Sequence, residues 1–154
     1  MSRPPARRRD RRMMGRALAL ARLNQGLTGE NPSVGCLILN ADGHVVGAGI
    51  TGRGGRPHAE EIALDEAGSA AKGGTAYVTL EPCRERSSGA ASCATRLVEA
   101  GIARVVVAIE DPHPTARDGL RILADAGVSL TVGTGHLRAA RLYDWFFRAS
   151  RDEA

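Results

Sequence analysis

The sequence is 154 residues long, is 43% hydrophobic and carries a formal net charge of +4, which fits one domain with a substantial buried core. Its longest apolar runs, such as VVVAI at 105–109, are far too short to cross a membrane. No continuous apolar segment follows the basic N-terminus, so a secretory signal is not expected. We therefore expect a cytoplasmic protein.

The positive charge is concentrated at the N-terminus. Residues 1–12 hold six arginines and one aspartate, whereas the rest of the chain has a net charge of −1. A basic arm can contact phosphates, but a folded body without net positive charge argues against a nucleic-acid partner. We interpret residues 1–12 as a disordered, solvated tail and residues 13–150 as the folded domain.

The first elements expected along the chain are a helix and a hairpin. Residues 11–26 have the periodicity of an amphipathic helix and end at a glycine. The apolar runs at 33–40 and 44–50 are separated by ADG, which is typical of a β-hairpin turn. A glycine-rich loop leads to a helix expected over about 58–71, and TAYVTL at 75–80 indicates a strand.

Helices and strands alternate after an irregular loop at 81–92. We expect helices at 93–101, 117–126 and 136–149, and strands at 103–110 and 128–132. The apolar run at 103–110 is typical of a strand covered on both faces. This pattern predicts an α/β fold with a mixed sheet between helices. The aromatic residues of LYDWFF, in the last helix, predict a stripe that faces the core or a partner subunit.

Three residues form a candidate metal site: His58, Cys83 and Cys93. Two of them, His58 and Cys93, lie at expected helix starts, and Cys83 follows the strand at 75–80. One imidazole and two thiolates suit zinc, with a fourth position open for water. The positive end of a helix dipole would favour the thiolate of Cys93. A closed zinc site, or two buried free cysteines, is the structural alternative.

Glu60 lies two residues after His58 and is not needed as a ligand. A carboxylate beside an open zinc site can take a proton from activated water and deliver it again. H-x-E followed by P-C and a second cysteine is the signature of zinc deaminases. The other cysteine and histidines are poorer candidates for metal ligands. Cys36 is expected to be buried in a strand. His44 lies in a hairpin strand, His113 in a turn and His136 at a helix start.

Five blocks of the sequence resemble the deaminase domain of the riboflavin-biosynthesis deaminase/reductase, a branch of the cytidine-deaminase superfamily. They are NPSVGCLI, GRPHAEEIAL, GGTAYVTLEPC, AGIARVVVAIEDPHP and LADAGVSL. The resemblance covers about residues 13–148 and implies a three-layer α/β/α sandwich with a mixed five-stranded sheet. It also implies that His58, Cys83 and Cys93 hold zinc and that Glu60 is the proton shuttle.

The same resemblance implies a reaction, the hydrolytic deamination of 2,5-diamino-6-ribosylamino-4(3H)-pyrimidinone 5′-phosphate in riboflavin biosynthesis. Asn31 would orient the pyrimidine or its sugar, because an amide both donates and accepts hydrogen bonds. A turn residue before Pro32 is the alternative for Asn31. The candidates for binding the phosphate are arginines on two loops, with solvated side chains as the alternative: Arg53, Arg56, Arg84 and Arg86.

Two departures from the family leave other functions open. The loop RERSSGAAS after Cys83 is one residue longer than the family's and has no His or Pro, and the loop TARDG is shorter. A deaminase of cytosine, guanine or dCMP type is therefore an alternative, and a zinc-stabilised binding protein without turnover is another. We see no reductase domain, so any reduction is expected from a separate protein, and we expect a homo-oligomer, specifically a dimer.

Overall fold

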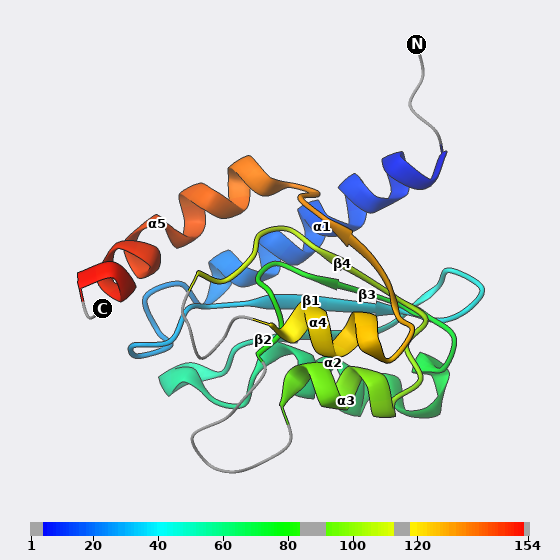
Figure 1. Ribbon diagram of the computed structural model, residues 1–154. Helices are drawn as coiled ribbons and strands as arrows, with labels where there is room; N and C mark the ends of the chain where they lie inside the picture. Colours follow the sequence, from blue (N-terminus) through cyan, green and yellow to red (C-terminus); the bar gives the residue numbers. More distant parts are fainter. Residues whose placement is uncertain (1–4, 84–91, 113–117, 153–154) are drawn as a thin grey trace.

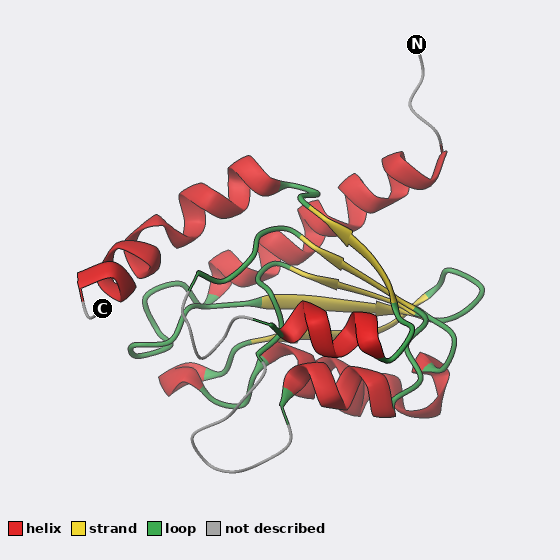
Figure 2. Ribbon diagram, in the orientation of Figure 1, coloured by secondary structure: helices red, strands yellow, loops and turns green. Residues whose placement is uncertain are grey.

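The computed structural model describes residues 5–83, 92–112 and 118–152, which form an α/β fold (Figures 1 and 2). The helices are α1 (Pro5–Leu23), α2 (Ala59–Ala67), α3 (Cys93–Glu99), α4 (Gly119–Asp125) and α5 (His136–Asp152). The strands are β1 (Gly35–Leu39), β2 (Val45–Ile50), β3 (Thr75–Val78), β4 (Arg104–Val107) and β5 (Ser129–Val132). Two short 3-10 turns, η1 (Arg53–Gly55) and η2 (Gly68–Ala71), flank α2. None of the helices in these ranges is long and apolar enough to cross a membrane.

The strands form one mixed sheet with the order β2-β1-β3-β4-β5. β1 is antiparallel to both β2 and β3, whereas β3, β4 and β5 run parallel. The predicted hairpin is confirmed, and its turn is held by the Asn40 side chain, which accepts hydrogen bonds from the backbone N–H groups of Asp42 and His44, both at 3.0 Å. Parallel strands bring their carboxyl ends to one edge of the sheet, which is where sites form in such folds.

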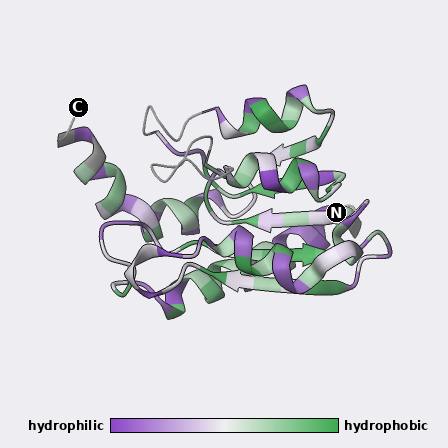
Figure 3. Ribbon diagram, turned by 90° about the horizontal axis from the view of Figure 1, so that it is seen from below, coloured by the Kyte–Doolittle hydropathy of each residue, from purple (hydrophilic) through white to green (hydrophobic). Residues whose placement is uncertain are grey.

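Helices cover both faces of the sheet, with α1 and α5 on one side and α2, α3 and α4 on the other (Figure 1). Successive strand residues point to opposite faces, so in β4 Val106 joins the core under α1 and α5, while Val105 and Val107 join the core under the other helices. This two-sided burial explains the continuous apolar runs of the sequence. Hydrophilic and hydrophobic residues alternate along the helices (Figure 3), as expected when one side of a helix faces the sheet.

Helix α2 packs directly on β2 through Gly47 and Gly49. A Cβ atom at Gly47 would overlap the carbonyl oxygen of Ala63, and one at Gly49 would overlap that of Ala59. Only a residue without a side chain lets the two backbones come this close. The contact sets the height of α2 above the sheet and therefore the position of the residues at its start.

The N-terminal segment differs from the prediction. Helix α1 begins at Pro5 and ends at Leu23, so residues 5–12 are helical and not a disordered tail, and the helix expected over 11–26 is wrong at both ends. The Asp10 side chain anchors the segment. Its buried carboxylate accepts hydrogen bonds from Arg104 Nη1 at 2.9 Å, Arg104 Nη2 at 2.6 Å and the Tyr77 hydroxyl at 2.8 Å. The sequence did not reveal this anchor, because the surrounding arginines make the segment look like a basic tail and Arg104 is 94 residues away from Asp10.

The aromatic stripe of α5 is divided between the core and the surface. Tyr143 is buried and Phe147 packs against the same core, which confirms the core-facing prediction for these two residues. Trp145 is 44% exposed, and Leu137, near the start of the helix, is 76% exposed. The outer side of α5 therefore presents apolar side chains to solvent in this chain.

We predict that replacing Asp10 by Asn lowers the free energy of unfolding by about 1–3 kcal/mol at pH 7, because Arg104 and Tyr77 lose a charged acceptor. Burial alone would raise the pKa of Asp10, but the hydrogen bonds from Arg104 and Tyr77 hold that pKa below its usual value. The stabilisation is therefore present at neutral pH and is lost as pH falls through the lowered pKa. Urea unfolding of parent and variant at pH 7 and in acid measures this, and an equal difference at both pH values would contradict it.

Candidate metal centre and active site

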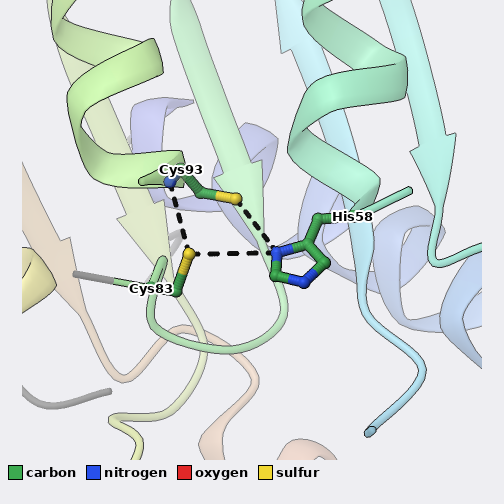
Figure 4. A group of neighbouring side chains, drawn as sticks. All are labelled: His58, Cys83 and Cys93. Atoms are coloured by element: carbon green, nitrogen blue, oxygen red, sulfur yellow. Dashed lines mark hydrogen bonds between the residues drawn. The ribbon is translucent and has the colours of Figure 1, made fainter. Parts of the chain in front are cut away.

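The side chains of His58, Cys83 and Cys93 converge at one point (Figure 4). His58 Nδ1 lies 3.3 Å from Cys93 Sγ and 3.8 Å from Cys83 Sγ, and the three donor atoms all lie within 4.8 Å of one another. In a tetrahedral zinc site with Zn–N of about 2.0 Å and Zn–S of about 2.3 Å, neighbouring ligand atoms are roughly 3.5 Å apart. The three residues therefore fit a zinc ion, and their predicted convergence is confirmed.

Two helix starts supply two of the three donors, as the sequence predicts. His58 is the N-cap of α2, and its backbone N–H donates a hydrogen bond to Glu61 Oε2 at 2.8 Å. Cys93 is the first residue of α3 and follows Ser92, whose hydroxyl oxygen accepts a hydrogen bond from the Thr95 N–H at 3.1 Å. These capping interactions fix the backbone from which both ligands project.

Cys83 lies on the turn after β3, and a buried carboxylate fixes that turn. Glu81 Oε1 accepts a hydrogen bond from the backbone N–H of Asp111 at 3.1 Å, and Oε2 accepts one from that of Leu120 at 3.3 Å. Glu81 thus ties the ligand turn to the segment after β4 and to the first turn of α4. No local pattern indicates this role for Glu81, because its partners are 30 and 39 residues away in the sequence.

A second network, of buried hydrogen bonds, connects α5 to the start of the turn that carries Cys83. The Tyr143 hydroxyl donates to the carbonyl oxygen of Ser33 at 2.8 Å and lies 2.7 Å from the Thr79 hydroxyl. The Thr79 hydroxyl also accepts a hydrogen bond from the backbone N–H of Gly35 at 3.0 Å. Tyr143 therefore links α5 to β1 and to the turn that leads to Cys83, a role that an aromatic stripe alone did not indicate.

The two sulfurs do not share the negative charge equally. Hydrogen bonding from the Cys93 side chain, with further help from His58 and the Cys93 backbone N–H at 3.3 Å, lowers the pKa of Cys83 to about 4. The pKa of Cys93 is raised instead, because its thiol donates to Cys83 and is buried. Two adjacent thiolates repel each other, so a cation bound between Cys83 and Cys93 favours the charged form of both.

Glu60, the second residue of α2, is buried beside this group. Burial and, secondarily, the charge of Cys83 raise the pKa of Glu60 to about 7. A carboxyl with such a pKa exchanges a proton readily near neutral pH. Cys36 is fully buried in β1, as predicted, and burial together with the Glu60 charge raises its pKa well above the usual value.

The expected substrate-binding residues are only partly described. Asn31 is exposed, and its side-chain amide donates a hydrogen bond to the Gly55 carbonyl oxygen at 3.3 Å. Arg53, also exposed, begins η1 on the same loop as Gly55. The structure therefore joins the loop that carries Asn31 to the loop that leads to His58. Arg84 and Arg86, and most of the loop TARDG, lie outside the described residues.

Residues 7–109 match the family model described as the cytidine and deoxycytidylate deaminase zinc-binding region. The chain therefore belongs to the cytidine and deoxycytidylate deaminase family. The matched region contains all three candidate ligands and Glu60, and the zinc-binding description agrees with the geometry of His58, Cys83 and Cys93.

Individual relatives place the chain more narrowly within the family. It is 45% identical over 139 residues to the riboflavin biosynthesis protein RibD of Haemophilus influenzae, and this match covers 90% of the chain but 37% of the relative. It is 35% identical to a diaminohydroxyphosphoribosylamino-pyrimidine deaminase of Buchnera aphidicola, with 93% of the chain and 97% of the relative covered. The chain thus spans a little over one third of the first relative and nearly all of the second.

A solved structure confirms the fold. The chain matches a crystal structure from Thermotoga maritima with a TM-score of 0.90 and 28% identity. That protein is described as a diaminohydroxyphosphoribosylaminopyrimidine deaminase/5-amino-6-(5-phosphoribosylamino)uracil reductase. The match covers 96% of this chain and 43% of that one. The expected cytidine-deaminase-like sandwich with a mixed five-stranded sheet is therefore confirmed.

We predict about one zinc ion per chain in protein purified without chelators. Replacing Cys83 or Cys93 by Ala should abolish zinc retention, because each removes a thiolate from a three-residue ligand set. Replacing Cys36 by Ala should leave the zinc content unchanged, since that thiol is buried in β1 and lies outside the group. Elemental analysis of the parent and the three variants measures this, and a metal-free parent would contradict the zinc assignment.

Proposed function

We propose that the protein is a zinc-dependent hydrolase that deaminates 2,5-diamino-6-ribosylamino-4(3H)-pyrimidinone 5′-phosphate, a step of riboflavin biosynthesis. The observation that carries the proposal is a set of three donors among the described residues, which would leave a fourth zinc position for water, next to a buried carboxylate outside that set. The names of the relatives from Buchnera aphidicola and Thermotoga maritima support the substrate. A purely structural zinc site would have no use for Glu60 in this position.

The chemistry divides between the metal and this chain's own residues. His58, Cys83 and Cys93 would hold zinc, which when bound supplies the Lewis acidity that makes water a nucleophile near neutral pH. The Glu60 carboxylate would accept a proton from that water and deliver it to the ring nitrogen of the substrate, and then carry a proton to the departing amino group. Water replaces the amino group, and the products are the pyrimidinedione and ammonia. Burial raises the pKa of Glu60, which helps the carboxylate to accept a proton before it delivers one.

Substrate recognition would come from the two joined loops beside the metal centre. The Asn31 side-chain N–H is held by Gly55, which orients the amide so that its carbonyl oxygen can accept a hydrogen bond from the base or the sugar. Arg53 is exposed on the neighbouring loop and suits a phosphate group, because a guanidinium can bind two phosphate oxygens at once. We propose Arg86 for the same role on the basis of the sequence.

The partners and the location are also proposals. The Thermotoga relative's name pairs deamination with reduction, so we propose that a reductase activity outside these 154 residues uses the product. Reduced cysteines in the metal centre suit a reducing compartment such as the cytoplasm. The exposed Leu137 and Trp145 on α5 support a homodimer formed through that helix.

We predict that Glu60→Gln keeps its zinc and its fold but loses nearly all turnover, by a factor of at least about 100, because an amide cannot carry the proton. Elemental analysis and ammonia release from the same preparation measure both effects. If the variant loses zinc together with activity, Glu60 acts as a ligand or as support for one, and the proton-shuttle role is wrong.

We predict that the phosphorylated substrate has a kcat/KM at least about tenfold higher than that of its dephosphorylated form, a difference of about 1.4 kcal/mol. Arg53→Ala and Arg86→Ala should each reduce this preference, mainly by raising KM. Arg148→Ala is the matched control, because Arg148 lies on α5 in an exposed ion pair with Asp144. The assay is ammonia release from a panel that includes cytosine, guanine and dCMP. Equal rates on both forms, or faster turnover of another base, would contradict the assigned substrate.

A further inference from the structure

An ion pair joins the two helices that carry His58 and Cys93. Glu61 lies three residues after His58 on α2, and Arg96 lies three residues after Cys93 on α3. Arg96 Nη2 is 3.5 Å from Glu61 Oε1. Residues three apart on a helix lie on the same side, one turn on, so the pair connects the helices one turn behind the two metal ligands.

The two oxygen atoms of the Glu61 carboxylate have different partners. Oε2 accepts the hydrogen bond from the His58 backbone N–H at 2.8 Å, while Oε1 faces Arg96. One buried group therefore holds the backbone of one ligand and, through Arg96, the helix that bears another. The Glu61 side chain is 10% exposed and the Arg96 side chain is 36% exposed, so solvent reaches the contact mainly from the Arg96 side and screens it only in part.

The position of the Arg96 side chain carries an energetic penalty. Its Nε atom is buried, and no acceptor among the described residues lies within hydrogen-bonding distance of it. Burying an N–H group away from an acceptor is unfavourable, and the ion pair with Glu61 offsets part of this penalty. Among the described residues, Arg96 forms an ion pair with Glu61, and this ion pair joins α3 to α2.

We propose that Glu61 and Arg96 act as a clamp between the two helices: the pair fixes the separation of His58 from Cys93 and so slows the release of zinc. Neither residue belongs to the group of three metal donors, and both act by positioning ligands. The inference rests on the proposed metal site but not on the identity of the substrate. Residues that orient metal ligands commonly affect metal affinity by about 10–100-fold.

The test measures zinc transfer from the purified, zinc-loaded protein to an excess of a chromophoric chelator, well below the unfolding temperature. Arg96→Met removes the charge but keeps much of the stem, and Glu61→Gln keeps an oxygen acceptor for the His58 N–H. Each variant should release zinc at least about tenfold faster than the parent. The double variant should release it no faster than the quicker single variant, because both changes break the same contact. Arg96→Lys should restore slow release in part.

Arg148→Met is the matched control, since it breaks an exposed ion pair with Asp144 on α5, which covers the opposite face of the sheet from α2 and α3 (Figure 1), and it should release zinc at the parent rate. Release from Arg96→Met and Glu61→Gln within twofold of this control would overturn the clamp. A higher KM for Arg96→Met without faster zinc release would assign Arg96 to substrate binding and also overturn it. If Arg96→Met does not fold, Glu61→Gln against the control decides. If the parent protein binds no zinc, the metal site and the clamp are both wrong. If the parent binds zinc and the variants release it at the control rate, only the clamp is wrong.

Discussion

Two neighbouring sulfur atoms cannot both carry a negative charge unless a cation lies between them, and this electrostatic constraint governs the site. The fold holds Cys83, Cys93 and His58 so close that the pKa of Cys83 falls while that of Cys93 rises. A zinc ion removes the conflict, because its charge stabilises both thiolates at once. The same close packing buries Glu60 and raises its pKa. The proposed metal binding and the proposed proton transfer would therefore both depend on one arrangement of charges.

Short elements bring the three ligands together, and tertiary contacts hold those elements in place. α2 and α3 are nine and seven residues long, too short to be stable as isolated helices. α2 is seated on β2 through Gly47 and Gly49, and the turn that carries Cys83 is tied to its surroundings by Glu81. On the opposite face, Tyr143 reaches the same turn through Thr79. The metal centre thus depends on helices from both layers of the sandwich.

Local sequence patterns were sufficient to predict the fold class and the candidate metal ligands. HAE at a helix start and EPC after a strand are each contained within a few residues, so the residue types point directly to His58 and Cys83 as candidate ligands and to Glu60 as the proposed proton shuttle. Cys93 could be added because it opens a helix after the loop. The alternation of helices and strands predicted a mixed sheet between helices, because strands that are buried on both faces require continuous apolar runs. All of these inferences depend on patterns of about ten residues or fewer.

The remaining features were decided by the tertiary structure, because they depend on residues far apart in the sequence. The start of α1 at Pro5 follows from the contact of Asp10 with Arg104, which no local pattern reveals and which overrides the appearance of a basic tail. The distribution of charge between the two cysteines depends on hydrogen bonds across the site. The pairing of Glu61 with Arg96 likewise exists only when α2 and α3 lie side by side. The sequence by itself determined which atoms could hold zinc and move a proton, because those residue types are local, and the folded chain determined how those atoms are held, because the contacts that hold them join distant segments.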